Sequence, residues 1–369
     1  MKKVSIITIL DNFNFGTYLQ AFALCKIIES IGYIPELVAY CRPGHAIIDQ
    51  YKRAISTTSN PLKIIARTYY AIRNLYLRKK DKNIIKKYLT RHKYYSYIEL
   101  KNNPPKADIY MTGSDQVWNS IYNNGIDKAF YLGYAPKNSI LISYGASIGM
   151  NEIPSTEKDE MFNLLSRYNS ISVREDLAKE LLIEIGIDKN KISQVLDPTL
   201  LLDKKEWNSL IKKRIYHFPY LLVYSVENKE QNYIISQTAN KIAQQYKLKI
   251  VGVYYGNKSF RIEGCDINYY RATPEIFLSL IYYAEFVIIS SFHGTAFSIN
   301  FEKEFLTISP KMFNSRITNL LKICNIENRI IHNINEIPQR LEPINYKVVK
   351  EHLDFFKNSS IQYLQNNLK

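Results

Sequence analysis

Short apolar runs alternate with segments of helical periodicity along the whole chain. In the first half, the strand-length runs occur at residues 4–10, 34–40, 108–113, 139–147, 170–173 and 192–196. In the second half, they occur at residues 220–226, 248–254, 267–270, 286–291 and 305–309. Strands separated by helices indicate β-α-β units and parallel sheets. The pattern therefore predicts an α/β fold with two Rossmann-like, doubly wound domains facing across a cleft.

The pattern restarts after Asp197-Pro198, because proline disfavours helical geometry in the residue before it. We place the domain boundary there, with an N-terminal domain of residues 1–203 and a C-terminal domain of residues 204–369. A chain of 369 residues is long enough for two separate cores. The last helical segment, at about 347–367, is a candidate to pack back on the N-terminal domain.

The composition is that of a folded soluble protein, with 46% apolar and 22% charged residues. No window offers the roughly 20 uninterrupted apolar residues that cross a bilayer. The apolar run Val4 to Leu10 is too short for an export signal and ends at Asp11, so a first strand explains it better. Four widely spaced cysteines without a CxxC pair are typical of reduced thiols in the cytosol. We therefore expect a cytoplasmic protein without structural zinc.

The net charge of +15 is concentrated in one segment. Residues 51–106 contain fifteen Lys or Arg and only two acids, Asp81 and Glu99, which gives a net charge of +13. Within them, residues 61–89 place apolar side chains at helical spacing against a basic face, and we predict a basic helical insert at about 45–106. Such a helix suits a membrane surface or another polyanion, and equally a solvated helix that packs on its own domain. Without a helix-turn-helix, RNP-like or zinc-finger pattern, nucleic acid is not expected as a partner.

The junction SSFHGTAFS follows an apolar strand and leads into a helix. In open parallel sheets, ligands bind beyond the carboxyl ends of the strands, where the next helix presents free N–H groups. Ser290 and Ser291 are small polar residues at this strand end. Gly294 permits a ligand to approach the backbone, and Thr295 can cap the helix. His293 then lies over an anion site, and a histidine that only braces the loop is the alternative.

Two junctions of the first half are also polar. Their candidate binding residues are Asn14, Gly16, Gln20, Ser114, Asp115 and Asn119. The first junction is no GxGxxG fingerprint, so a dinucleotide is not expected there. The second adds the indole of Trp118, on which the C–H face of a sugar can stack while donors and acceptors pair with its hydroxyls. Helix capping is the alternative role for Ser114 and Asp115.

Cationic side chains lie near these junctions. Arg174 directly follows a strand, Arg316 opens a helix of the second domain, and Lys303 lies beyond the helix that His293 leads into. A guanidinium grips a carboxylate or phosphate in bidentate fashion, whereas lysine acts as a point charge. These cations predict a small anionic substrate, although a surface ion pair with a neighbouring acid is the alternative for Arg174. No Walker A, GxSxG, HExxH or paired-cysteine motif occurs, so neither metal nor thiol chemistry is expected.

Six segments, taken in their order along the chain, resemble the polysaccharide pyruvyl transferase family. They are NFGTYLQAFAL, GSDQVWN, SYGAS, SVRE, LDPTLLL and SSFHGTAFSINFEKEF. The resemblance extends from residue 4 to about 330, and the basic segment 51–106 matches least. It implies a GT-B-like fold and transfer of the pyruvyl group of phosphoenolpyruvate onto two hydroxyls of a sugar, giving a ketal. It also implies a lipid-linked or polymeric glycan precursor as acceptor and no further cofactor.

This reaction assigns a role to each candidate residue. Arg174 and Arg316 would clamp the carboxylate and phosphate of phosphoenolpyruvate, with Lys303 as a supporting cation. Protonation of its methylene carbon needs a group that titrates near neutrality, so His293 would be the general acid/base. We expect the imidazole and the guanidinium groups to share a solvent-accessible gap. The catalytic candidates are His293 and Arg174, the donor-binding candidates are Ser290, Ser291, Gly294, Thr295, Lys303 and Arg316, and the first-half residues form the acceptor side.

Two other functions are compatible with the sequence. A GT-B-type glycosyltransferase would bind a nucleotide sugar in the same architecture, with the diphosphate at the helix N-terminus. A non-catalytic glycan-binding or membrane-associated assembly protein would use the basic insert as its anchor and would tolerate replacement of His293. The expected location is the cytoplasm, with peripheral contact at the inner membrane surface if the insert binds lipid.

Overall fold

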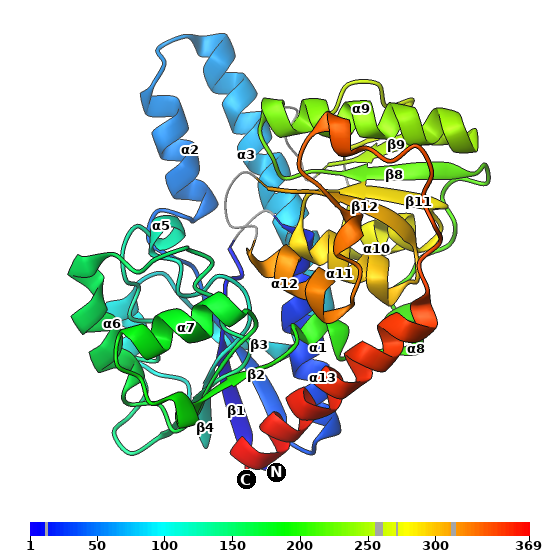
Figure 1. Ribbon diagram of the computed structural model, residues 1–369. Coiled ribbons are helices and arrows are strands. Elements are labelled where there is room, and N and C mark those ends of the chain that lie inside the picture. Colours follow the sequence, from blue (N-terminus) through cyan, green and yellow to red (C-terminus); the bar gives the residue numbers. More distant parts are fainter. Residues whose placement is uncertain (12–13, 255–260, 271, 311–314) are drawn as a thin grey trace. The chain divides into compact units, whose positions relative to one another are not determined.

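The computed structural model describes residues 1–11, 14–254, 261–270, 272–310 and 315–369 (Figure 1). The chain divides into two compact units. Unit 1 contains Met1–Pro198 and Ser360–Lys369, and unit 2 contains Thr199–Ser359. Each unit is built around a parallel sheet, which the alternation of strands and helices predicts.

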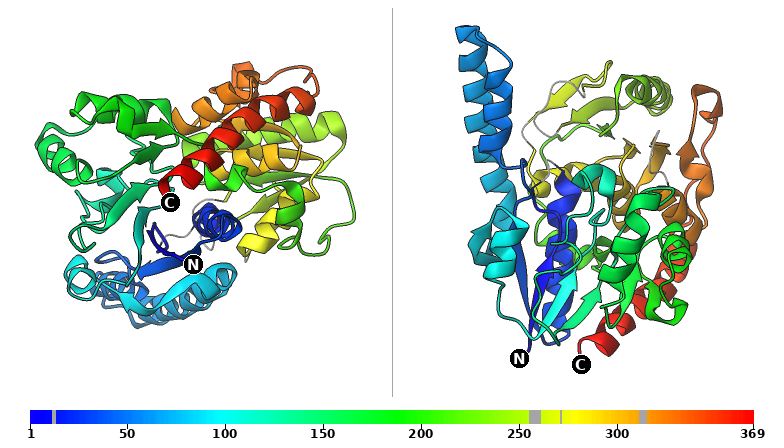
Figure 2. Two further views of the ribbon diagram at one scale, coloured as in Figure 1. Left: turned by 90° about the horizontal axis from the view of Figure 1, so that it is seen from below. Right: turned by 90° about the vertical axis from the view of Figure 1, so that its left-hand side faces the viewer.

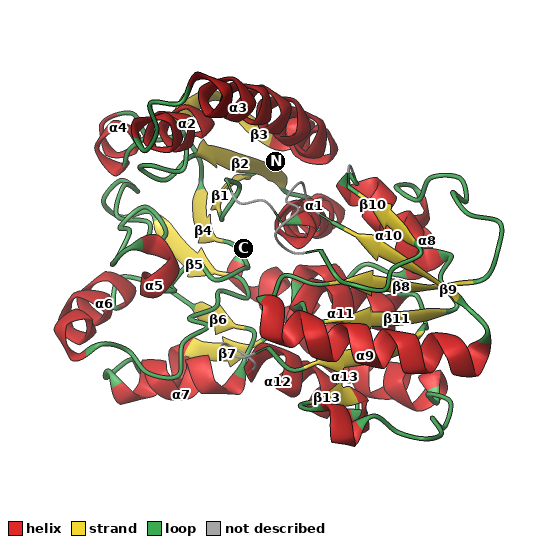
Figure 3. Cartoon of the chain, turned by 90° about the horizontal axis from the view of Figure 1, so that it is seen from above, coloured by secondary structure: helices red, strands yellow, loops and turns green. Residues whose placement is uncertain are grey.

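In the described part of unit 1, the main sheet has five parallel strands in the order β3-β2-β1-β4-β5. They are β1 (Lys3–Ile7), β2 (Ile34–Tyr40), β3 (Leu89–Tyr94), β4 (Ile109–Thr112) and β5 (Ile140–Ser143). Isolated bridges from Ile142 and Ala146 continue this sheet toward the parallel pair β6 (Ile171–Val173) and β7 (Ile192–Gln194). Figure 3 shows β5, β6 and β7 in that succession. Strand β4 lies between β1 and β5 and is buried throughout, as expected for an interior strand of a parallel sheet.

The helices of unit 1 pack around these strands. They are α1 (Phe15–Ser30), α4 (Tyr97–Asn102), α5 (Ser120–Asn123), α6 (Lys158–Leu165), α7 (Asp176–Glu184) and the end of α13 (Tyr346–Asn367). The apolar helix α1 is buried along most of its length, and Asn14 caps it by accepting a hydrogen bond from the Gly16 N–H (2.9 Å). At the end of α13, the Tyr363 hydroxyl donates to the Ser143 carbonyl (2.9 Å), which attaches the C-terminal segment to this unit.

The basic segment contains a helical hairpin and then an edge strand. The helices α2 (Ile47–Ser56) and α3 (Pro61–Asp81) form the hairpin, which extends past the strand ends of unit 1 (Figure 2). A 3₁₀ segment, Lys82–Tyr88, leads into β3, which pairs with β2. The prediction of a helical insert is therefore wrong over β3. Residues 91–93 of β3 are exposed and carry charged or titratable side chains, as is common in an edge strand. Because such a run is polar, the sequence of β3 looks like that of a surface helix.

Among the residues that the structure describes, the sheet of unit 2 has six parallel strands in the order β10-β9-β8-β11-β12-β13. They are β8 (Tyr220–Tyr224), β9 (Lys249–Val253), β10 (Ile267–Tyr269), β11 (Phe286–Ile289), β12 (Glu304–Ile308) and β13 (Ile330–Ile331). In chain order this is 3-2-1-4-5-6, the Rossmann arrangement. The two-residue strand β13 is absent from the predicted set because so short a strand shows no periodicity.

The helices of unit 2 cover both faces of its sheet. They are α8 (Lys204–Asn208), α9 (Lys229–Tyr246), α10 (Pro274–Tyr282), α11 (Phe292–Asn300), α12 (Ser315–Ile323) and most of α13. Helix α9 covers one face, where Ile235 and Ile242 join the core, and α10 lies on the other face, where Phe277 meets the ring of Tyr224 (Figure 1). The strand order reverses between β8 and β11, as it does between β1 and β4 in unit 1. Ligands of such sheets bind at the carboxyl edge beside this reversal.

Three further features concern the described part of the chain. The four cysteines, Cys25, Cys41, Cys265 and Cys324, are free thiols. Among the residues that the structure describes, no helix combines the length and apolar character needed to cross a bilayer. Short 3₁₀ turns complete the described structure at Ser155–Glu157, Lys189–Lys191, Pro198–Leu200, Glu327–Arg329 and Ile334–Glu336.

Candidate functional site

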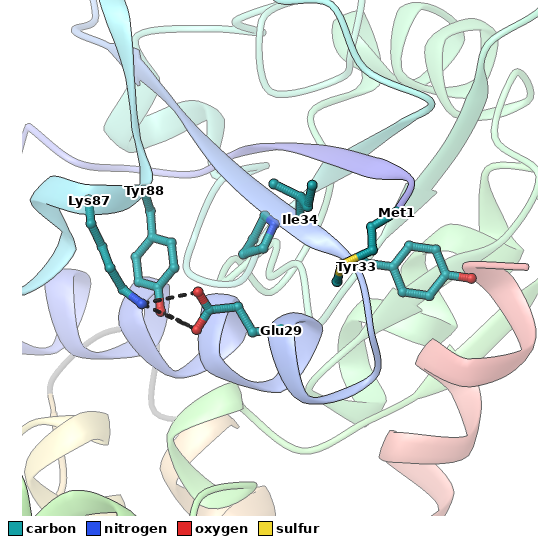
Figure 4. A pocket seen from close by; sticks show the side chains of 7 residues that line it. Met1, Glu29, Tyr33, Ile34, Lys87 and Tyr88 are labelled. Atoms are coloured by element: carbon teal, nitrogen blue, oxygen red, sulfur yellow. Dashed lines mark hydrogen bonds and ion pairs between the residues drawn. The ribbon is translucent and has the colours of Figure 1, made fainter.

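One surface pocket of unit 1 lies at the amino edge of its sheet (Figure 4). Met1 and Ile34, which line it, stand at or before the starts of β1 and β2. The Glu29 carboxylate in this pocket already accepts hydrogen bonds from Lys87 Nζ (3.0 Å) and the Tyr88 hydroxyl (2.7 Å). The predicted chemistry lies at the opposite, carboxyl edges of the two sheets.

Two serines lie at the strand reversal of unit 2. The Ser290 Oγ donates to the Ser225 Oγ (3.3 Å) and accepts from the Val226 N–H (3.4 Å). The Ser225 Oγ donates in turn to Asn232 Oδ1 (2.6 Å). Ser225 is missing from the predicted set because the strand was extended to residue 226, although Ser225 follows β8 just as Ser290 follows β11. Its position as a small polar residue directly after an apolar strand could have identified Ser225.

Ser291 caps α11, and this corrects the role expected for Thr295. The Ser291 Oγ accepts from the Gly294 N–H (3.0 Å), whereas the fully buried Thr295 hydroxyl donates to the Ser291 carbonyl (3.1 Å). Gly294 serves the same cap, because a Cβ there would lie 2.8 Å from Ser291 Oγ and 3.2 Å from a methyl group of Ile289. Close internal packing therefore explains Gly294, and not the ligand approach that we expected.

His293 and Arg316 both contact the ring of Phe292. The imidazole meets this ring edge-on with a centroid distance of 5.3 Å, and the central guanidinium carbon of Arg316 lies 5.8 Å from the Phe292 centroid. His293 is the second residue of α11, and Arg316 is the second residue of α12. These helices follow the neighbouring strands β11 and β12. Two helix N-termini, with their partial positive charge, therefore lie at the edge that carries an imidazole and a guanidinium.

The imidazole of His293 is buried. The residue is only 5% exposed, and its Nε2 atom is inaccessible to solvent. The expectation of a solvent-accessible ring is therefore wrong for this conformation, because the ring packs against Phe292.

Lys303 lies at the other edge of the unit 2 sheet. It precedes β12, and its Nζ donates to the carbonyl of Ala284 (2.9 Å), which precedes β11. The length of α11 separates it from His293. Burial lowers the pKa of Lys303 to about 8. The structure thus does not bring Lys303 to His293, as the expected donor-binding role requires.

Arg174 is the centre of a buried ionic network in unit 1. Its side chain is 1% exposed. The Nη1 atom pairs with Asp197 and donates to Ser114 Oγ (3.2 Å), and Nη2 lies 3.5 Å from Asp115 Oδ1. The Nε atom lies 3.8 Å from Glu175 Oε2. Burial disfavours the charged guanidinium, but the surrounding carboxylates raise the pKa of Arg174.

This network changes the role that we assign to Arg174. A guanidinium that faces three carboxylates has no excess charge to offer a substrate anion, and its burial excludes a surface ion pair. It belongs to unit 1, whereas His293 and Arg316 belong to unit 2. We therefore treat Arg174 as a positioning residue that holds Ser114 and Asp115. Asp197, which was predicted only to mark the domain boundary, completes this network by accepting from Ser114 Oγ (2.9 Å).

The acceptor-side candidates Gln20, Ser114 and Asp115 are linked by hydrogen bonds. The Thr17 hydroxyl donates to Asp115 Oδ2 (3.2 Å), and Gln20 Nε2 donates to Thr8 Oγ1 (3.1 Å). The Thr8 hydroxyl then donates to the Ser114 carbonyl (2.5 Å). Asp115 adopts a φ of 87°, and such strain in a non-glycine residue is frequent at functional sites. Thr8 and Thr17 were missed because they resemble ordinary strand-end and helix residues.

The remaining candidates of the first half have structural partners. Asn119 is fully buried; it caps α5 by accepting from the Tyr122 N–H (3.1 Å), and its Nδ2 donates to Gln116 Oε1 (2.8 Å). Trp118 is 1% exposed, stacks on Tyr131 and donates to the Phe130 carbonyl (3.1 Å). The expected stacking of a sugar on Trp118 is therefore wrong. Among the described residues, no group of three or more His, Cys, Asp or Glu side chains is arranged to hold a metal ion.

Comparison with solved structures identifies the fold. The chain is similar to a putative UDP-N-acetylglucosamine 2-epimerase from Listeria monocytogenes (TM-score 0.51, 13% identity, 98% of this chain and 90% of that chain covered). It is also similar to UDP-GlcNAc 2-epimerase from Neisseria meningitidis bound to UDP-GlcNAc (TM-score 0.51, 8% identity, 100% of this chain and 99% of that chain covered). A third similar structure is trehalose-6-phosphate synthase OtsA (TM-score 0.51, 8% identity, 99% of this chain and 97% of that chain covered). Identities this low show the fold alone, which is a two-domain α/β fold of the GT-B type.

Comparison with curated proteins gives no match. The family model described as "Polysaccharide pyruvyl transferase" matches residues 14–311. This range includes His293, Arg174 and the polar junctions of both sheets, and it ends five residues before Arg316. The chain therefore belongs to the polysaccharide pyruvyl transferase family.

Proposed function

We propose that this protein transfers the pyruvyl group of phosphoenolpyruvate onto two hydroxyls of a sugar in a glycan precursor, forming a pyruvate ketal and releasing phosphate. Family membership supports the reaction class. One arrangement supports the donor: His293 and Arg316 meet on Phe292 at the N-termini of α11 and α12. Phosphoenolpyruvate brings a carboxylate and a phosphate to this positive edge and a methylene carbon that needs a proton.

In the proposed reaction His293 is the general acid/base. It gives a proton to the methylene carbon, which takes the π electrons of the double bond, while a sugar hydroxyl bonds to the adjacent carbon. The proton of that hydroxyl returns to the imidazole. Phosphate then leaves with the electrons of its C–O bond, the second hydroxyl adds to the same carbon, and its proton leaves with the phosphate. The reaction needs no other reactant.

We assign the acceptor to the carboxyl edge of unit 1. Asp115 and Asn14 keep some exposure among the candidates there, so they are the groups that we expect to contact sugar hydroxyls. Gln20, Ser114 and Asn119 are fully buried and would hold the site in shape. The decisive experiment is phosphate release from phosphoenolpyruvate with a panel of glycan precursors. A precursor that triggers release and gains a ketal supports the proposal, and no release with any precursor argues against it.

A nucleotide sugar is the second candidate donor. The unit 2 sheet has the strand order of nucleotide-binding sheets, and two similar solved structures contain UDP or UDP-GlcNAc. Thermal shift with phosphoenolpyruvate and UDP-GlcNAc, offered separately, distinguishes the two. Stabilisation by phosphoenolpyruvate alone supports pyruvyl transfer, and stabilisation by UDP-GlcNAc alone supports a glycosyltransferase.

Replacing Arg316 by alanine is expected to raise the KM for phosphoenolpyruvate by about 10-fold or more with a smaller effect on kcat, because a charge-assisted contact to the donor is lost. The KM of Arg316→Lys should lie between those of the wild type and Arg316→Ala, because lysine keeps the charge but lacks the planar guanidinium. Arg340→Ala, which removes an exposed arginine of the same unit, is the matched control. A wild-type KM in Arg316→Ala would remove this residue from the donor site.

Replacing Lys303 by methionine is expected to leave phosphate release unchanged, because Nζ lies at the opposite edge of the sheet. The stability of the wild type relative to this variant should rise between about pH 8 and about pH 10.4. In that window the unfolded chain still holds the proton that folded Lys303 has lost. Below it both states are protonated, so the difference stays constant. Urea unfolding at several pH values measures the slope, and a strong loss of activity would return Lys303 to the donor site.

A further inference from the structure

Helix α3 presents a row of apolar side chains to solvent, which we call the α3 stripe. It consists of Leu62, Ile65, Tyr69, Ile72 and Tyr76, which are between 57% and 76% exposed. Their spacing of three and four residues places them on one side of the helix, over a length of about 21 Å.

The other side of α3 packs on α2. The hydroxyls of Tyr51 and Thr68 lie 2.9 Å apart, and Arg67 Nη1 donates to Thr57 Oγ1 (3.0 Å). The hairpin extends past the strand ends of unit 1 (Figure 2). The interpretation of α3 as a helix that only packs on its own domain therefore accounts for its α2 side and not for the α3 stripe.

Basic residues flank the α3 stripe, and acids are absent. Residues 61–80 contain six Lys or Arg and no Asp or Glu. At 100° per residue, Arg73 and Lys80 lie on one flank of the stripe and Lys79 on the other. Lys79 and Lys80 are exposed. An occupant of this face must therefore offer an apolar region together with negative charge.

A second copy of the chain does not meet this requirement. The spacing of the α3 stripe is that of a coiled-coil seam, but Arg73 and Lys80 then occupy flanking positions where no acid can pair with them. The net charge of +15 adds to the repulsion between copies. An anionic bilayer offers acyl chains to the aliphatic residues, headgroup phosphates to the lysines, and an interface suited to tyrosine.

We propose that the α3 stripe and its flanking lysines bind the surface of a membrane that contains anionic phospholipid, with α3 lying in the plane of that surface. The inference rests on exposed groups of unit 1 and is independent of the chemistry proposed at His293. Binding requires both the apolar row and the charge, since either alone gives weak and reversible attachment.

Vesicle co-sedimentation of the full chain tests this proposal. Vesicles of phosphatidylcholine with phosphatidylglycerol are expected to bind the protein, more weakly as salt rises, and vesicles of phosphatidylcholine alone to bind it poorly. The double variant Ile65→Ser/Ile72→Ser should lose about 10-fold or more in affinity. The double variant Lys79→Gln/Lys80→Gln should lose about 30-fold at low salt.

Matched controls separate docking from general effects on the protein. Phe355→Ser removes an exposed apolar residue of α13, and Lys137→Gln/Lys189→Gln removes two exposed lysines elsewhere in unit 1. Both should bind vesicles as the wild type does, and all variants should keep the wild-type melting temperature. Absent binding, equal binding to both vesicle types, or wild-type binding by the two α3 variants would overturn the proposal. A wild-type dimer that Ile65→Ser/Ile72→Ser converts to a monomer would overturn it in favour of a second copy.

Discussion

Replacing His293 by alanine is expected to lower kcat for phosphate release from phosphoenolpyruvate by about 100-fold or more, because a positioned acid/base accelerates proton transfer by that order. The ring is buried beside Phe292, so bulk water does not readily take its place. The KM for phosphoenolpyruvate should change less, since Arg316 is retained. Steady-state rates with varied phosphoenolpyruvate and saturating acceptor measure both constants.

The competing explanation, a histidine that only braces α11, is tested with two further variants. His293→Gln keeps a polar side chain of similar size, so it should retain most of the stability and yet be as slow as the alanine variant. His352→Ala removes an exposed histidine of α13 and should behave as the wild type. Near-normal turnover in His293→Ala, with reduced stability as its main effect, would show that the residue is structural.

Replacing Arg174 by methionine is expected to destabilise unit 1 by about 3–5 kcal/mol, because it leaves buried carboxylates without the charge that balances them. Asp197, Asp115 and Glu175 all lie within ion-pair distance of this guanidinium. Arg174→Lys should destabilise unit 1 less, because lysine keeps the charge but lacks the planar guanidinium that reaches several carboxylates at once.

The two tryptophans allow the units to be followed separately. Trp118 is buried in unit 1 and Trp207 in unit 2. In a Trp207→Phe background, urea unfolding monitored by fluorescence reports unit 1, where Arg174→Met should lower the midpoint. In a Trp118→Phe background the same substitution should leave the unit 2 transition unchanged. If the unit 1 midpoint does not move while the KM for phosphoenolpyruvate rises, Arg174 is an anion clamp after all.

Most of the strands could be predicted because both sheets are parallel and buried. Their strands are continuous apolar runs, such as residues 220–224 and 286–289, which stand out from the helical segments between them. The failures were strands without that signal: β3 exposes charged residues at a sheet edge, and β13 has two residues. In both cases pairing with a distant strand decides the structure, and local sequence does not record it.

The candidate site was predictable in position more than in detail. A polar residue after an apolar strand identified Ser290, Ser114 and Arg174, because strand ends of a parallel sheet share one edge. The side chains that contact each of these residues could not be predicted in this way. Two of the carboxylates around Arg174 belong to Asp115 and Asp197, which are far from it in the chain, so spacing along the sequence carries no trace of these ion pairs.

The sequence by itself determined the α/β class, the repeated strand-helix plan and the junction that carries His293, because these depend on periodicity and on neighbours along the chain. The ordered motifs also determined the family. Only the tertiary structure decided which side chains meet: it put Arg316 on the ring of Phe292, which His293 also contacts, Lys303 at the far edge and Trp118 in the core. The physical reason is that burial and ion pairing depend on distance in space, which the fold sets and local sequence does not.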